Sequence, residues 1–167
     1  MVHSGPGWEA ARALGAKAPC QIPLPWAERE ELAKDSPDFG TLQILAGDPV
    51  TGVRRKAARN PSTPATSLER LAQDPDVVVR RSVAKNPNTP VAVLTRLARD
   101  PEDHARYWAA DNPAAPAALL SQLAEDPSEE VRWEVANNPS TPTSALAQLA
   151  DDPSEYVRQA ARERVPL

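Results

Sequence analysis

The chain has 167 residues, enough for one ordinary domain, and its lone Cys20 and two histidines leave little material for a disulfide, a metal site or a thiol catalyst. Its net charge of −4 is uneven: residues 48–99 hold ten Arg or Lys and four Asp or Glu, whereas residues 100–167 hold five and thirteen. No stretch approaches the roughly 18 apolar residues of a membrane span and the N-terminus has no apolar signal region, so we expect a soluble cytoplasmic protein without a cofactor.

Residues 1–31 precede the regular part of the sequence. Trp8 to Leu14 favours a short helix, Pro19 to Pro25 an extended segment, and Ala27 to Lys34 another helix. Because the ends of a repeat array need a different outer face, we expect this segment to cap the repeats that follow.

Residues 32–167 are a repeat array. Each full repeat begins at the aspartate of an Asp-Pro pair and has 26 residues, and a fixed period of this length is typical of a solenoid. A partial repeat comes first, then four full repeats and a half repeat: 32–47, 48–73, 74–99, 100–125, 126–151 and 152–167.

Each repeat predicts two short helices. The Asp of Asp-Pro is expected as N-cap of the first helix with Pro at its first position, and Glu129 and Glu155 would complete capping boxes. This helix should end after about ten residues at an Asn-Pro pair, since the residue before proline avoids the helical region. The Asn-Pro pairs begin at Asn60, Asn86, Asn112 and Asn138.

The second helix should begin at a Thr-Pro pair. Thr63, Thr89 and Thr141 are the expected caps, and Ala115 is a weaker start in the third full repeat. Leucines and alanines spaced i, i+3 and i+4 give this helix a buried stripe. They are Leu68, Leu71, Ala72, Leu94, Leu97, Ala98, Leu120, Leu123, Ala124, Leu146, Leu149 and Ala150.

The phrase D-P-x-x-x-V-R-x-x-V-A-x-N-P-x-T-P-x-x-x-L-x-x-L-A resembles the variant leucine-rich repeat family over roughly residues 32–167. The resemblance implies an all-α, right-handed superhelical solenoid in which α- and 3₁₀-helices alternate. The sequence leaves open which helix is 3₁₀. Some members carry an N-terminal cysteine cluster that binds an iron–sulfur centre, but Cys20 stands alone here, so we expect none.

A helical wheel of the first helix separates two sets of residues. One arginine in each repeat falls in the apolar arc, which favours pairing with carbonyls and cap aspartates of neighbouring repeats over phosphate binding. These are Arg54, Arg80, Arg106, Arg132 and Arg158. The repeated asparagines are most simply turn-closing side chains.

The outward arc varies between repeats and supplies the candidate partner-binding residues. They are Arg55, Lys56, Arg59, Arg81, Lys85, His104, Tyr107, Trp108, Trp133 and Tyr156. Two interpretations of the aromatic residues stay open, packing between adjacent repeats and anchoring a partner. The basic residues equally fit a solvated helix face, and His104 is expected as a surface residue rather than a ligand.

The sequence contains no catalytic constellation, Gly-rich phosphate loop or His-x-x-x-His spacing. We therefore expect a non-enzymatic scaffold whose variable face binds a protein, with Arg55, Lys56 and Arg81 steering an acidic region of that partner. The alternative is nucleic-acid binding through the basic residues and the aromatic patch, against which stands the acidic second half of the array.

Overall fold

The computed structural model describes residues 22–164, which form eleven helices and no strand. The chain divides into two compact parts, residues 1–88 and 89–167, which we call the N-terminal and C-terminal parts. The helix expected over Trp8 to Leu14 and the lone Cys20 lie outside the described residues. Within residues 22–164, no helix is both long and apolar enough to cross a membrane.

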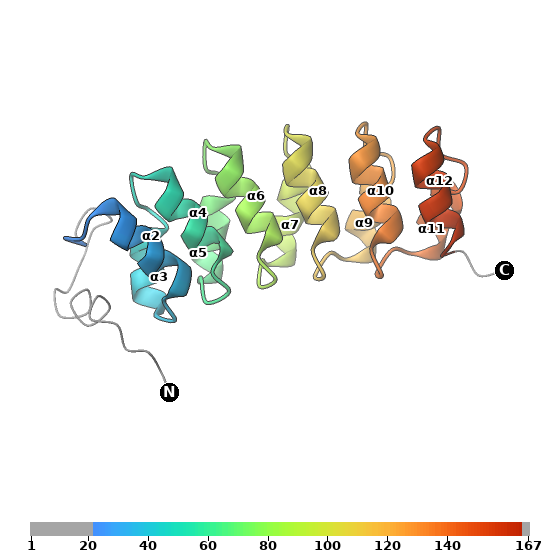
Figure 1. Cartoon of the computed structure of the whole chain (residues 1–167). Helices are drawn as coiled ribbons and strands as arrows, with labels where there is room; N and C mark the ends of the chain where they lie inside the picture. The colour runs from blue at the N-terminus through green and yellow to red at the C-terminus, as the bar shows by residue number, and fades with distance from the viewer. Residues whose placement is uncertain (1–21, 165–167) are drawn as a thin grey trace. The chain divides into compact units, whose positions relative to one another are not determined.

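In the N-terminal part, the first helices of successive repeats pack side by side and the second helices lie behind them (Figure 1). The first helices are α2 (Trp26–Asp35), α4 (Thr51–Arg59) and α6 (Val77–Lys85), and the second are α3 (Phe39–Leu45) and α5 (Ala65–Leu71). Although α2 lies partly in the segment expected as a cap, it packs on α4 as α4 packs on α6.

The C-terminal part has the same arrangement, with α10 between α8 and α12. Its first helices are α8 (Asp103–Asp111), α10 (Glu129–Asn137) and α12 (Glu155–Arg162), and its second are α7 (Val91–Leu97), α9 (Ala117–Leu123) and α11 (Thr143–Leu149). The predicted all-α array of two-helix repeats is therefore confirmed. Both helices are α, and each second helix adds i→i+3 bonds of 3₁₀ type at its ends, such as Ser67 N–H to the Pro64 carbonyl.

The core is built from the stripes that the sequence predicted. The leucines of the second helices are at most 4% exposed, and Val53, Val79, Ala105 and Val131 of the first helices are fully buried. Burying one such side chain contributes roughly 1.5–3 kcal/mol, so the facing stripes are the main source of stability.

The Asn-Pro pairs end the first helices as predicted, and their asparagines also join repeats. Asn60 Oδ1 accepts a hydrogen bond from the Ser62 N–H at 2.8 Å, which closes the turn. Asn86 Nδ2 donates to the Ala58 and Asn60 carbonyls, 28 and 26 residues earlier, at 2.9 and 2.8 Å. Each asparagine therefore satisfies its own turn and the end of the preceding first helix.

The prediction that the Asp of Asp-Pro caps the first helix is wrong. The helices begin three residues after that Asp, with Val50, Asp76, Glu102, Ser128 and Ser154 as N-caps. Asp48 Oδ1 instead accepts from the Val50 N–H at 2.9 Å, an Asx-turn before the helix. Glu129 and Glu155 are therefore the first helical residues, and the expected capping-box spacing is absent.

The predicted role of the Thr-Pro threonines is also wrong. Proline is the N-cap of the second helices α5 and α11, and Thr63 and Thr141 donate their hydroxyls to the Ala57 and Val135 carbonyls. The threonines thus complete the end of the first helix, where carbonyls lack intrahelical partners.

The repeated arginines point into the stack and pair as predicted. Arg54 donates from Nε and Nη2 to both carboxylate oxygens of Asp74, at 2.6 and 3.1 Å, and from Nη1 to the Asp48 carbonyl at 2.9 Å. The equivalent pairs are Arg29–Asp48, Arg106–Asp126 and Arg132–Asp152. Both carboxylate oxygens and two arms of the guanidinium are satisfied, which a buried ion pair requires.

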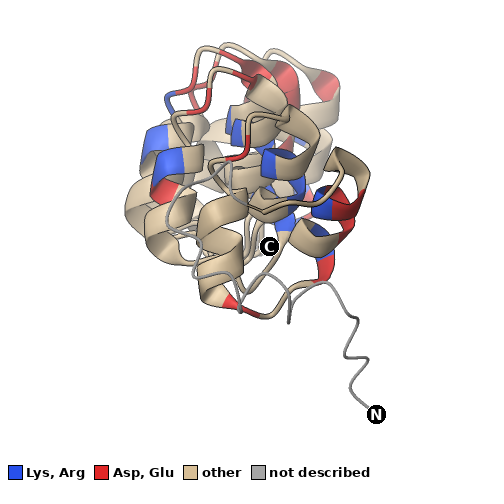
Figure 2. Ribbon diagram, turned by 90° about the vertical axis from the view of Figure 1, so that its left-hand side faces the viewer, with Lys and Arg blue, Asp and Glu red and all other residues tan. Residues whose placement is uncertain are grey.

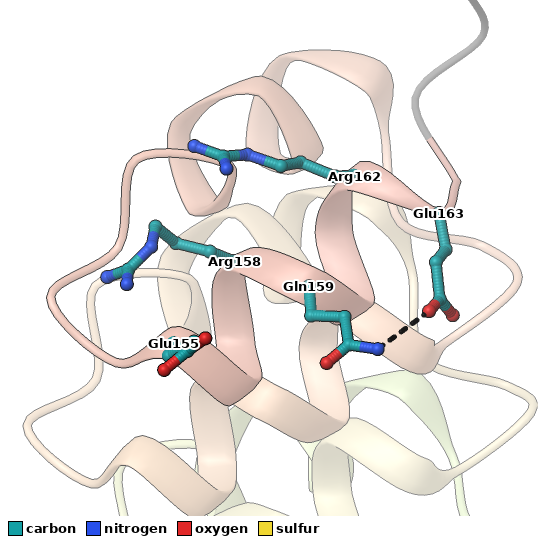
Figure 3. Close-up of a pocket in the computed structure, with 5 residues that line it drawn as sticks. All are labelled: Glu155, Arg158, Gln159, Arg162 and Glu163. Carbon is teal, nitrogen blue, oxygen red and sulfur yellow. Dashed lines mark hydrogen bonds between the residues drawn. The ribbon is translucent and has the colours of Figure 1, made fainter.

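Arg158 keeps only the carbonyl half of this arrangement. Its Nη1 donates to the Asp152 and Pro153 carbonyls at 2.6 and 3.0 Å, but no carboxylate in residues 22–164 takes its other arm. In Figure 3, Arg158 and Arg162 point to one side of α12, while Gln159 and Glu163 lie on the other.

These two situations predict different costs for removing the arginine. Arg132→Ala leaves the buried Asp152 without its counter-ion, so we expect a loss of about 3 kcal/mol in the free energy of unfolding. Arg158→Ala removes two partly exposed carbonyl bonds and should cost ~1 kcal/mol. Denaturant midpoints measure both, and equal losses would show that the carboxylate pairing is not what stabilises the stack.

The third full repeat lacks the threonine hydroxyl. Ala115 is buried, and its N–H donates to the Asn112 carbonyl. The N–H groups of Thr63 and Thr141 donate in the same way to the carbonyls of the Asn three residues before them. Ala115→Thr should therefore donate to the Ala109 carbonyl and stabilise the chain by ~1 kcal/mol, with Thr141→Ala losing about as much. Thermal unfolding tests both changes; destabilisation by Ala115→Thr would mean that the site has no room for the added atoms.

Candidate functional site

The outward positions of the first helices form one surface in each part of the chain. We call Arg55, Lys56, Arg59, Arg81 and Lys85 on α4 and α6 the basic face. We call the outward positions of α8, α10 and α12 the aromatic face, which carries His104, Tyr107, Trp108, Trp133 and Tyr156. Figure 2 shows the basic and acidic residues on the ribbon.

The basic face is partly neutralised by α2. Arg55 Nη2 lies 3.2 Å from Glu30 Oε1, and the Glu30 side chain is only 18% exposed. Gly52 leaves room for this pair, because a Cβ there would lie 3.1 Å from a Glu30 oxygen. Arg59 and Lys85 are exposed, and Lys56 and Arg81 are half-buried. The most exposed cations of this face are therefore at the ends of α4 and α6.

The aromatic face combines half-buried and exposed rings. Tyr107 and Trp108 are half-buried and meet edge to face, with ring centroids 5.0 Å apart. Trp133 is 41% exposed and Tyr156 is 72% exposed. The first pair is consistent with packing in the stack, whereas the second pair presents apolar area to solvent.

Carboxylates accompany the aromatic rings. Glu134, next to Trp133 on α10, is only 7% exposed and interacts with the Tyr107 hydroxyl and with Asp111, both on α8. Burial raises the pKa of Glu134, and Asp111 raises it further, while hydrogen bonding from Tyr107 acts in the opposite direction. Burial and the interaction with Glu134 likewise raise the pKa of Tyr107, so its hydroxyl stays a donor.

His104 lies at the exposed edge of the aromatic face. Its Nδ1 is 2.8 Å from Asp103 Oδ1, and its side chain is 71% exposed. Hydrogen bonding to His104 lowers the pKa of Asp103. Over residues 22–164, no group of three or more His, Cys, Asp or Glu is placed to hold a metal ion.

Helical periodicity alone does not indicate a role for Glu134 or Asp111. Asp111 lies one helical turn after Tyr107 on α8, whereas the link from Tyr107 to Glu134 follows from the stacking period, since residues 25 to 28 positions apart meet between neighbouring first helices, as in Arg55–Glu30 and Asn86–Ala58. Glu134 is 27 residues after Tyr107, so reading the sequence at that spacing would have found the pair.

Comparison with known proteins agrees with the geometry. A family model described as "Leucine rich repeat variant" matches residues 51–76, 77–102 and 129–154. A solved structure titled "A leucine-rich repeat variant with a novel repetitive protein structural motif" is similar over 95% of this chain, with 27% identity and a TM-score of 0.69, and this chain spans 61% of that protein's length. An engineered protein is similar over 83% of this chain and 86% of its own, with 18% identity and a TM-score of 0.46. A search of curated proteins found no match.

The raised pKa of Glu134 predicts a pH-dependent stability. The folded state holds the Glu134 proton more tightly than the unfolded state does, so the charged carboxylate destabilises the fold above the raised pKa, and this penalty disappears as the pH falls through it. Glu134→Gln should raise the melting temperature at neutral pH by roughly 2–4 °C, with the gain shrinking toward about pH 4.

The matched control for this measurement is Glu130→Gln on the same helix. Glu130 is exposed, and its pKa is lowered by the Ser128 hydroxyl, so its substitution should bring no gain at neutral pH. Equal gains from both substitutions would attribute the effect to net charge, and a loss from Glu134→Gln would show that the carboxylate stabilises the fold.

Proposed function

The chain belongs to the leucine-rich repeat variant family, and from this helical-repeat scaffold we propose a non-enzymatic protein that binds another protein through the outward faces of its first helices. The exposure of Trp133 and Tyr156 carries the proposal. The asparagines of the Asn-Pro pairs are buried and the repeated arginines bond within the fold, whereas these two rings are left in solvent on adjacent first helices. Exposed Trp and Tyr side chains are typical anchors of protein interfaces.

The half-buried Tyr107 and Trp108 of α8, which meet edge to face, would add contact area in the proposed interface. The basic face of the N-terminal part would add electrostatic attraction: Lys56, Arg81 and the more exposed Arg59 and Lys85 would steer an acidic region of the partner. Arg55 contributes less to this steering, because it is already paired with Glu30. A reduced cytoplasmic setting, expected from the single cysteine, remains part of the proposal.

Nucleic-acid binding is the second candidate, and the basic face is the observation that favours it. Stacking platforms for bases are normally set in positively charged grooves. Here the face that holds the exposed rings also carries the exposed Asp111, Glu130 and Glu163, and these carboxylates would repel a phosphate backbone. The protein-binding function is therefore the better supported of the two.

A pull-down from an extract of the cell that produces the protein tests the proposal. We expect Trp133→Ala/Tyr156→Ala to lose the partners that the parent chain captures while keeping its helical circular dichroism. Both side chains are exposed, so their removal should hardly affect folding.

The matched control removes two exposed aromatic residues elsewhere, Trp26→Ala/Phe39→Ala, whose side chains are 58% and 64% exposed on α2 and α3. This control should keep the partners. If it loses them and the Trp133/Tyr156 variant retains them, the interface lies on the N-terminal part and the proposal is wrong.

A further inference from the structure

The charged side chains at the outward positions of the aromatic face are all acidic. Three exposed carboxylates occupy its outward positions, with no Lys or Arg among them: Asp111, Glu130 and Glu163. The residues just before the arc add Asp103, Glu129 and Glu155 at the starts of the three helices. A ligand of this face therefore meets aromatic rings in a negative field.

The arginines of the C-terminal part do not offset this field, because they lie elsewhere. Arg106 and Arg132 are paired with Asp126 and Asp152 in the stack. Arg158, Arg162 and Arg164 donate to backbone carbonyls, Arg96 is on α7, and Arg99 Nη2 reaches Gln122 Oε1. The described residues 89–164 contain no lysine.

Two features of the face suit a cation. Trp133 has the exposed Glu130 one helical turn before it, so its exposed ring stands beside a carboxylate. An ammonium or guanidinium over a Trp ring gains a cation–π interaction, and an adjacent carboxylate adds a charge-assisted hydrogen bond. The exposed Asp111 of α8 and Glu163 of α12 add carboxylates whose charge a cation would partly neutralise.

From this geometry we infer that the aromatic face binds a basic polypeptide segment, with an Arg or Lys side chain seated against Trp133 and Glu130. The inference rests on the proposed function and adds the partner's chemical class at this face. An acidic segment or a nucleic acid would meet the three exposed carboxylates. A second copy of the chain is less suited, because the Arg55 of its basic face is already paired with Glu30.

The test is fluorescence anisotropy with a fluorescein-labelled Arg-Ala repeat peptide, and with a Glu-Ala repeat peptide and an oligo-dT as further probes. We expect saturable binding of the basic peptide alone, weakening as salt is added. Glu130→Lys/Glu163→Lys, which changes two exposed positions of the face, should weaken this binding at least roughly tenfold.

The matched control is Glu125→Lys/Asp151→Lys, which changes the net charge equally at exposed positions that follow α9 and α11. It should keep most of the binding. Equal losses of peptide binding in the two variants would show that only overall charge matters and would overturn the inference. Preferential binding of the Glu-Ala peptide or of the oligo-dT would overturn it as well.

Sedimentation velocity of the unlabelled chain completes the experiment. Concentration-dependent association that the Glu130/Glu163 variant abolishes would identify a second copy as the occupant and overturn the choice of a separate partner. If the basic peptide fails to bind while the pull-down still depends on Trp133 and Tyr156, the protein-binding function stands and only the basic class of partner falls.

Discussion

The fork between an arginine of a first helix and the aspartate of the next Asp-Pro turn, as in Arg54–Asp74 and Arg132–Asp152, constrains the rest of the structure. Arg132 donates from two arms to Asp152 and from a third to carbonyls at the start of its own repeat. Burial raises the pKa of Asp152, but the bonds from Arg132 and the Ser154 N–H outweigh it, so the pKa lies below its ordinary value and the carboxylate stays charged. A charge buried in this way tolerates little displacement, which holds the repeat at 26 residues.

This constraint divides the surface by function. Residues that face the stack form the repeated Arg–Asp and Asn–carbonyl contacts or pack in the leucine core. A substitution there leaves a buried group without its partner. Outward positions do not have to make these contacts, so they can differ between repeats without destabilising the fold. The N-terminal part uses them for cations and the C-terminal part for aromatic rings and carboxylates. For this reason we place partner recognition at the outward positions of the first helices, where the repeats differ most.

The sequence predicts those features that depend on one helix or one turn. The helix ends at Asn60 and its equivalents, the leucine stripes and the inward arginines all follow from local geometry and periodicity. The N-cap lies two residues after the predicted Asp48, and the Thr63 hydroxyl bonds the end of the first helix instead of the start of the second, because each side chain has more than one backbone group within reach and the sequence does not choose between them. The Tyr107–Glu134–Asp111 cluster was missed because a wheel treats a helix alone, whereas these residues meet across neighbouring helices.

Site-specific photo-crosslinking in the producing cell tests most directly the claim that partners bind the outward arc of the first helices. A photoreactive residue in place of Asn137, exposed beside Trp133 on α10, should capture a partner protein. The same residue in place of Ser121, exposed on the second helix α9, should capture none. Crosslinks from position 121 without any from position 137 would contradict the account.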